Sequence, residues 1–131
     1  MRSMQTTNDT TTNEATIDRY LVMFNEADGT IRTELAREVF ADDGRLVDPL
    51  IDAAGPEQVA AAIGTLRDQM PGHSLTRTTV VDAHHTYARF GWTVNGPDGT
   101  VAVAGIDVVT FAADGRIQTA IGFFGDPAPV A

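Results

Sequence analysis

Apolar positions recur with helical spacing over the first half of the chain. Spacings of three, four and seven residues, which mark one face of an amphipathic helix, relate four residues: Ile17, Tyr20, Leu21 and Phe24. This first helix is expected to begin at Glu14 and to end at Asp28-Gly29. A second helix, capped by Thr30, is expected to end at Asp43-Gly44, and a third to cover residues 56–70. The first half of the chain is therefore predicted to be mainly helical.

From His73 onward the period of the apolar positions changes to two, as it does in strands. Four long strands are predicted over residues 74–82, 85–95, 100–112 and 115–124, with a short strand earlier at 45–48. Helices segregated from strands in this order predict an α+β domain. We expect a cone-shaped, curved antiparallel sheet with three helices packed on its concave face. Such a sheet encloses a cavity in which a ligand can bind.

Composition limits the kinds of partner. The 131 residues, 43% of them hydrophobic, suffice for one core, which we place at residues 14–126 between a disordered tail (1–13) and a short C-terminal tail (127–131). The net charge of −9 disfavours nucleic acid and anionic membranes, and no apolar run is long enough to span a bilayer. Cysteine is absent, and no metal-binding or cofactor-binding motif occurs. We therefore expect a cytoplasmic protein that uses neither a metal nor a cofactor.

Asp48 lies at the end of an apolar strand, in Leu46-Val47-Asp48-Pro49-Leu50. Burial among apolar neighbours raises the pKa of a carboxyl group, which suits a base that takes up a proton near neutral pH. The alternative interpretation is a solvated turn aspartate that precedes a proline.

Asp107 interrupts the otherwise apolar strand segment Val103–Phe111. An unpaired, ionised carboxylate there would cost several kcal/mol or take up a proton. A protonated carboxylic acid in a cavity can donate a hydrogen bond to a developing oxyanion. The alternative interpretation pairs Asp107 with Arg89 or Arg77 on a neighbouring strand.

Two further polar side chains are candidates for the cavity. Tyr20 lies on the inner face of the first helix, where its hydroxyl needs a partner, either the backbone or a ligand. His84 shares the inward face of its strand with Phe90 and Trp92, although exposed turn histidines are the other interpretation of His84 and His85. The two adjacent histidines do not have the spacing of a metal site.

Taken together, these segments resemble the ketosteroid-isomerase family, within the SnoaL-like and nuclear-transport-factor-2-like superfamily. Residues 18–21 are similar to the segment that carries the family's oxyanion-hole tyrosine. The stretch FADDGRLVDP at 40–49 is similar to the signature ADDA-x-V-x-DP, and residues 105–119 are similar to the strand pair IDV-x-x-F…GRI. The resemblance implies that Asp48 is the general base and that Tyr20 and a protonated Asp107 donate hydrogen bonds to an enolate oxygen.

By this resemblance the chain is predicted to be an enzyme that removes a proton next to the carbonyl of a small apolar substrate. Isomerisation, cyclisation and dehydration would use the same residues. Eight side chains are candidate walls of the substrate pocket: Phe24, Phe40, Ile63, His84, Phe90, Trp92, Val103 and Phe123. The alternatives are a non-catalytic ligand-binding or dimerisation module and, less directly, addition of water to an epoxide.

The outer face of the sheet is expected to be apolar. Alternation places four residues there: Ala102, Ala104, Ile106 and Val108. Such a stripe is unfavourable in water, so we expect a homodimer that forms through the sheet.

Overall fold

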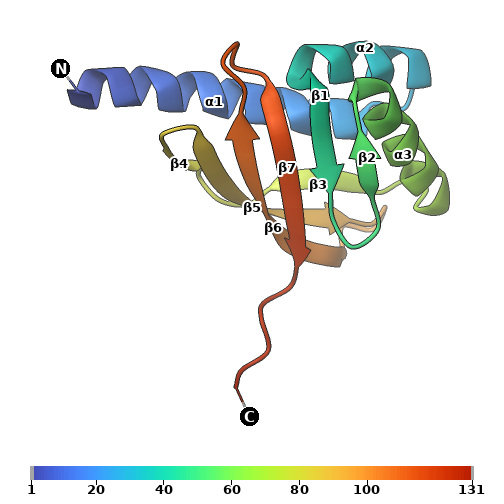
Figure 1. Cartoon of the computed structure of the whole chain (residues 1–131). Coiled ribbons are helices and arrows are strands. Elements are labelled where there is room, and N and C mark those ends of the chain that lie inside the picture. Colours follow the sequence, from blue (N-terminus) through green and yellow to red (C-terminus); the bar gives the residue numbers. More distant parts are fainter. Residues whose placement is uncertain (1, 131) are drawn as a thin grey trace.

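The computed structural model describes the backbone of residues 2–130 and the side chains of residues 12–130. Three helices, α1 (Arg2–Asn25), α2 (Gly29–Val39) and α3 (Pro56–Gln69), pack against one side of a curved sheet (Figure 1). This arrangement confirms the predicted α+β cone.

The starts of the helices follow from local sequence. Asp28, and not Thr30 as expected, caps α2, because the Asp28 carboxylate accepts hydrogen bonds from the backbone N–H groups of Thr30 (2.9 Å) and Ile31 (3.0 Å). Pro56 occupies the first turn of α3, where its missing N–H leaves no bond unmade. Helix α1 begins at Arg2, inside the segment expected to be a disordered tail, whereas Met1 lies outside the described residues. The limits proposed for the domain stay predictions.

The sheet contains seven strands: β1 (Phe40–Val47), β2 (Asp52–Ala54), β3 (Ser74–Arg77), β4 (Asp82–His84), β5 (Tyr87–Asn95), β6 (Val101–Phe111) and β7 (Ile117–Phe124). Their order is β2-β1-β7-β6-β5-β3, and β4 also pairs with β5. Among the described strand pairs, β1 and β7 run parallel and the others antiparallel, so the sheet is mixed and not wholly antiparallel. It curls so that β1 and β7 stand steeply across β3 (Figure 1).

Two strands differ from the expected boundaries. β1 begins at Phe40, not Arg45, because Phe40 and Ala41 are buried in the core and Phe40 pairs with Ile117. The strand expected at 74–82 is divided into β3 and β4. Between them Thr79 lies over a glycine of β5: its hydroxyl oxygen accepts a hydrogen bond (2.8 Å) from the N–H of Gly91, and a Cβ there would lie only 2.9 Å from Thr79 Cγ2.

The core fills the space between the helices and the concave face of the sheet. Its largest fully buried side chains come from both the helices and the sheet and include Ile17, Met23, Phe40, Leu46, Ile63 and Phe90. The helices thus contribute apolar side chains to the same core as the strands. Within the part of the chain that the structure describes, no helix combines the length and the apolar character needed to cross a bilayer.

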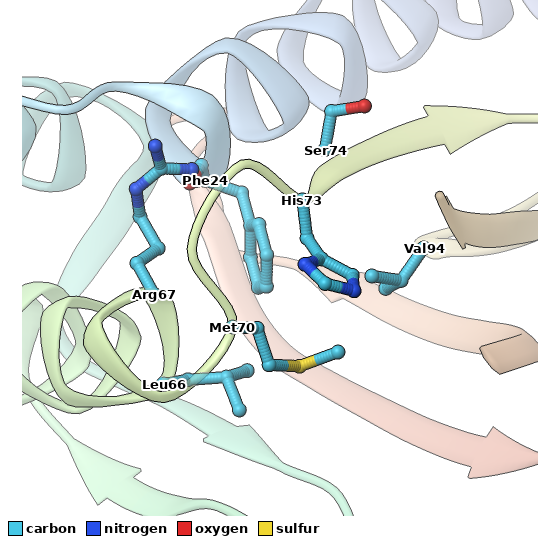
Figure 2. Close-up of a pocket in the computed structure, with 7 residues that line it drawn as sticks. All are labelled: Phe24, Leu66, Arg67, Met70, His73, Ser74 and Val94. Atoms are coloured by element: carbon cyan, nitrogen blue, oxygen red, sulfur yellow. Dashed lines mark hydrogen bonds between the residues drawn. The ribbon is translucent and has the colours of Figure 1, made fainter. Parts of the chain in front are cut away.

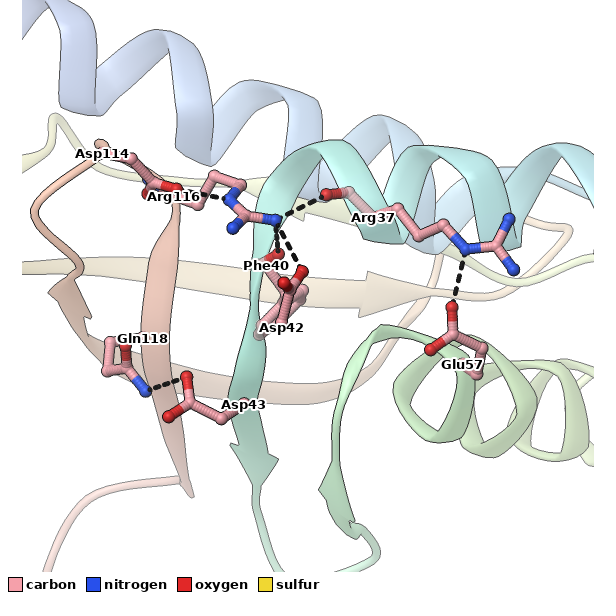
Figure 3. A network of polar contacts seen from close by, with 8 residues as sticks. All are labelled: Arg37, Phe40, Asp42, Asp43, Glu57, Asp114, Arg116 and Gln118. Atoms are coloured by element: carbon pink, nitrogen blue, oxygen red, sulfur yellow. Dashed lines mark hydrogen bonds and ion pairs between the residues drawn. The ribbon is translucent and has the colours of Figure 1, made fainter.

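Arg116 fastens the turn between β6 and β7 to the junction of α2 and β1 (Figure 3). Its Nη1 donates to the backbone oxygens of Arg37 (3.3 Å) and Phe40 (3.2 Å) and to Asp42 (3.1 Å), while its Nε donates to Asp114 (2.8 Å). These bonds satisfy carbonyl groups at the end of α2 that have no helical partner. This end of the molecule is therefore held by charged and polar contacts.

Candidate functional site

A cavity lies between the helices and the concave face of the sheet. Its lining consists of Tyr20, Phe24, Asp48, Leu50, Leu66, Met70, Leu75, Trp92, Val94, Val103, Asp107 and Phe124. The centres of water molecules can occupy about 40 Å³ of it, which is room for a few waters. Four of these side chains carry polar groups, and none of the lining residues is basic.

Asp107 is the more deeply buried of the two carboxyl residues of the lining, with 5% of its surface exposed. Its Oδ1 accepts a hydrogen bond of 2.8 Å from the indole N–H of Trp92 on the neighbouring strand β5. The arginines considered as partners are bound elsewhere, because Arg77 pairs with Asp18 (3.1 Å) and Arg89 with Asp82 (2.8 Å). The ion-pair alternative for Asp107 is therefore not what the structure shows.

Two glycines make room for this arrangement. Gly105 is the cross-strand partner of Trp92, and a Cβ on it would lie 2.5 Å from Trp92 Cζ2. Gly122 is the cross-strand partner of Asp107, and a Cβ there would lie 2.8 Å from Asp107 Oδ1 and 3.1 Å from Asp48 Cβ. A side chain at either position would collide with the polar residues. The two missing side chains let the indole lie beside Asp107 and leave Asp48 and Asp107 on either side of Gly122.

Asp48 follows the last residue of β1 and is partly buried. Its Oδ1 accepts hydrogen bonds from the backbone N–H groups of Leu50 (2.7 Å) and Ile51 (2.8 Å), which fixes the carboxylate in a turn. Its Oδ2 makes no hydrogen bond with any residue that the structure describes. Asp48 is therefore a turn aspartate, as the alternative interpretation had it, and it also lines the cavity.

The environment perturbs the acidity of the two other candidate catalytic groups. Burial raises the pKa of Asp107 to about 6, and the charge of Asp48 adds to this shift. The hydrogen bond from Trp92 and, to a smaller extent, the nearby hydroxyl of Tyr20 oppose it. Burial, followed by the charges of Asp107 and Asp48, also raises the pKa of Tyr20 well above its usual value. Tyr20 therefore stays a neutral hydroxyl, and Asp107 titrates near neutrality.

The structure separates the other candidate pocket residues into three groups. Phe24, Trp92 and Val103 line the cavity. Phe40, Ile63 and Phe90 are 0–2% exposed and belong to the core instead. His84 is exposed on β4, with its Nδ1 3.0 Å from that of His85, in a surface hollow that shares no residue with the cavity.

Phe123 lies on the outer face of β7 and is 62% exposed, so it does not contact the cavity. Its neighbour Phe124 does, with its ring edge against Trp92 at a centroid distance of 5.6 Å. The signal for this was the period of two, which places Phe124 on the same face as the small residues Ala120 and Gly122.

Six lining residues were not predicted to be walls of the cavity: Leu50, Leu66, Met70, Leu75, Val94 and Phe124. Leu66 and Met70 lie on the inner face of α3, where apolar periodicity does not distinguish a cavity wall from the core. Val94 could have been found, since it lies two residues after Trp92 on the same face of β5.

A second hollow adjoins the cavity at the C-terminal end of α3 (Figure 2). Four side chains line both spaces: Phe24, Leu66, Met70 and Val94. Arg67, His73 and Ser74 complete the second hollow, where Arg67 donates a hydrogen bond of 3.2 Å to the backbone oxygen of Phe24. The two spaces therefore have these four side chains in common as walls.

The described residues contain no group of three or more histidine, aspartate or glutamate side chains arranged to hold a metal ion. The chemistry that the arrangement itself offers is acid–base chemistry, because one carboxylate with a free oxygen and two hydrogen-bond donors surround an apolar space.

The fold and the cavity define an α+β cone that carries two carboxyl groups in an apolar pocket. The chain belongs to the SnoaL-like domain family, whose model matches residues 9–120. A search of curated proteins finds no match to the chain.

Three solved structures illustrate the similarity. A candidate isomerase of the SnoaL-like family from Agrobacterium tumefaciens strain C58 is 33% identical with a TM-score of 0.84, and the match covers 88% of this chain and 99% of that one. A protein with a cystatin-like fold from Methylobium petroleophilum PM1 is 24% identical (TM-score 0.72, 91% and 79% covered). A candidate SnoaL-like polyketide cyclase from Jannaschia sp. CCS1 is 20% identical (TM-score 0.66, 87% and 85% covered). The last two show similarity of fold alone.

Proposed function

We propose that the protein is an acid–base enzyme that works without a cofactor and removes a proton from the carbon next to a carbonyl group. The observation that carries this proposal is the pair Asp48 and Asp107, which line one apolar cavity without an arginine or lysine partner among the described residues. Carboxyl groups kept without cations in an apolar site are suited to transfer protons. The family and its isomerase-type relative from Agrobacterium support the same class of reaction.

The three polar residues take separate roles. Asp48 uses its free Oδ2 to take the proton, while the backbone bonds to Oδ1 keep the carboxylate in place. Protonated Asp107 and Tyr20 donate hydrogen bonds to the enolate oxygen that forms when the C–H bond breaks. Return of the proton from Asp48 to another carbon of the enolate completes an isomerisation with no net gain or loss of atoms. Cyclisation and dehydration begin with the same enolate.

The cavity favours a neutral, apolar substrate. Its described lining contains no basic side chain that could neutralise an anion, and eight of its residues are aliphatic or aromatic hydrocarbons or a thioether. The carbonyl group would lie toward Tyr20 and Asp107. The rest of the molecule would extend past Met70 toward the second hollow, at which the imidazole of His73 lies (Figure 2).

Deuterium exchange tests the proposal directly. The protein is incubated in D₂O with a panel of neutral, apolar ketones that can enolise, and incorporation of deuterium next to the carbonyl is followed by NMR. We expect exchange above the rate in buffer, and about tenfold slower exchange for Tyr20→Phe, because one of two donors is lost while the ring remains. Ketones that bind the protein, detected by quenching of Trp92 fluorescence, but do not exchange would instead support a non-catalytic binding module.

We also propose that a second copy of the chain covers the outer face of the sheet. The stripe on β6 continues onto β7, where Ile106 pairs with Phe123 and Val108 with Ile121, and all four side chains are 36–62% exposed. Residues 126–130 extend away from the end of β7 and do not cover this face (Figure 1). A face of this kind, uncharged at these positions, is complementary to its own copy.

Sedimentation equilibrium at micromolar concentration should give about twice the monomer mass. Phe123→Glu should shift the mass to that of a monomer, since a carboxylate would then be buried in the interface. Val130→Glu, a matched change on the exposed tail, should leave the mass unchanged. A wild-type monomer would contradict the proposal.

A further inference from the structure

Trp92 is the only tryptophan of the chain, and its indole N–H donates a buried hydrogen bond to Asp107. The ring is held from two sides. Gly105 lies beneath it with no side chain to displace it, and the edge of Phe124 packs against it at a centroid distance of 5.6 Å. Trp92 and Asp107 come from adjacent strands, so the direction of the N–H bond is set by the sheet and not by a flexible loop.

This geometry has a consequence for the acid that the proposed reaction needs. When Asp107 is protonated, its Oδ1 already accepts the indole N–H at 2.8 Å, and an acceptor oxygen in such a bond is the poorer place for the proton. The proton is therefore left to Oδ2. A carboxyl group whose two oxygens were equivalent would divide its proton between two directions.

We infer that Trp92 is a positioning residue: its indole N–H holds Oδ1 of Asp107 as an acceptor, directs the acid proton to Oδ2, and sets the pH at which Asp107 loses that proton. This inference rests on the proposed function for its catalytic meaning. The hydrogen bond and its effect on Asp107 can be measured without any substrate.

The sign of the effect follows from the groups around Asp107. Burial and the charge of Asp48, at the end of β1, favour the protonated acid, whereas the donors Trp92 on β5 and Tyr20 on α1 favour the carboxylate. On β7 the facing residue is Gly122, which brings no charge. Loss of the indole donor must therefore raise the pKa of Asp107 and keep the acid protonated to higher pH.

The single tryptophan permits a replacement of one N–H group. Growth of a tryptophan auxotroph on β-(3-benzothienyl)alanine replaces only Trp92, with a sulfur atom where the indole carries N–H, so that shape and packing are kept. The pKa of Asp107 is then read from the ¹³C shift of its carboxyl group, assigned by its absence in Asp107→Asn. We expect an upward shift of about 1 to 2 pH units, the size expected for one hydrogen bond to a charged group.

Val94→Ala is the matched control. Val94 lines the same cavity two residues along β5, so its truncation admits water but keeps the indole N–H. Added water favours the carboxylate, and the pKa of Asp107 should therefore fall or stay constant. An upward shift in both proteins would mean that packing around the acid, and not the N–H donor, is responsible, and would overturn the inference.

Two further readouts distinguish the inference from the proposed function. In the wild-type protein the single indole N–H signal should move with pH, with a midpoint of about 6, and should stop moving in Asp107→Asn. If wild-type protein exchanges ketone protons, the alkaline fall of its pH profile should move up by the same amount in the benzothienyl protein. An unchanged pKa of Asp107 there would overturn the role of Trp92, whereas a shifted pKa with no exchange in any protein would overturn the proposed function alone.

Discussion

Carboxylates at the two ends of the sheet have opposite environments: at one end they pair with an arginine, and at the other they line an apolar cavity. Near the turn between β6 and β7, Asp42 and Asp114 both bind Arg116, and hydrogen bonds from Arg116 lower the pKa of Asp114 (Figure 3). At the cavity, Asp48 and Asp107 pair with no arginine of the described part of the chain, and burial raises the pKa of Asp107 to about 6. The arginine ion pairs of the described residues involve Asp18, Asp42, Asp52, Glu57, Asp82 and Asp114. The comparison indicates that carboxyl groups placed in an apolar cavity without a cation, and not the missing cation alone, mark the candidate active site.

The same substitution at both ends should give the largest contrast. Asp48→Asn should lower the rate of ketone exchange by about 10²–10⁴-fold, because an amide cannot take up the proton. Asp42→Asn should leave exchange within about twofold and lower the melting temperature slightly, since it weakens a contact to Arg116. If Asp48→Asn and Asp42→Asn both folded and lost exchange to the same extent, the difference between the two ends of the sheet would have no functional meaning.

Asp107→Asn tests the cost of leaving a carboxyl group buried without a cation. Because the pKa of Asp107 is about 6 in the folded protein against an ordinary 3.8, the folded state loses stability as pH rises from about 4 to 6, by about 3 kcal/mol in total. Asparagine does not ionise. The unfolding free energy of the variant, measured with denaturant, should therefore increase relative to that of the wild type as pH rises through this range. The difference should stay constant at higher pH.

If the unfolding free energy of the wild-type protein fell no more than that of Asp107→Asn between pH 4 and 7, the raised pKa of Asp107 would be contradicted. Exchange should fall less than in Asp48→Asn, because the asparagine amide can still donate one hydrogen bond.

Gly122→Ala tests the space between the two carboxyl groups. The added Cβ would lie 2.8 Å from Asp107 Oδ1 and 3.1 Å from Asp48 Cβ, so we expect a loss of about 1–3 kcal/mol in unfolding free energy together with slower exchange. Gly29→Ala is the control, because its Cβ would meet Arg32 at an ordinary 3.8 Å. If Gly122→Ala changed neither the unfolding free energy nor the exchange rate, the space that Gly122 leaves between Asp48 and Asp107 would be dispensable.

Much of the fold was predictable because each helix carries its own signals. The apolar spacing of Ile17 and Phe24 and the proline at 56 are local signals, and the structure keeps them. The expected cap at Thr30 was wrong, because Asp28 caps the second helix. The strand starting at Phe40 and the three-residue β2 were not predictable in this way, since both depend on partners distant in the sequence. The period of two identified β5, β6 and β7 but did not show which pair would be parallel.

The site was predictable in its polar residues and less so in its walls. A carboxylate in an apolar strand is a strong local anomaly, which is why Asp107 could be singled out. Whether Phe40, Ile63 and Phe90 line a cavity or fill the core depends on where the packing leaves a gap, and all three are core residues. The bond between Trp92 and Asp107 also escaped prediction, because it joins two strands through the space above a glycine.

The parallel pairing of β1 with β7 has a consequence for the order of folding. It brings Val47 against Ile121, so that most of the domain lies between the two segments in the sequence, and closing such a long loop carries a large entropic cost. The hairpins β5–β6 and β6–β7 join near neighbours and can form early. Asp48 reaches Gly122 only when β1 pairs with β7, so Asp48 and Asp107 come together in one late step. An incompletely folded chain therefore lacks a functional site.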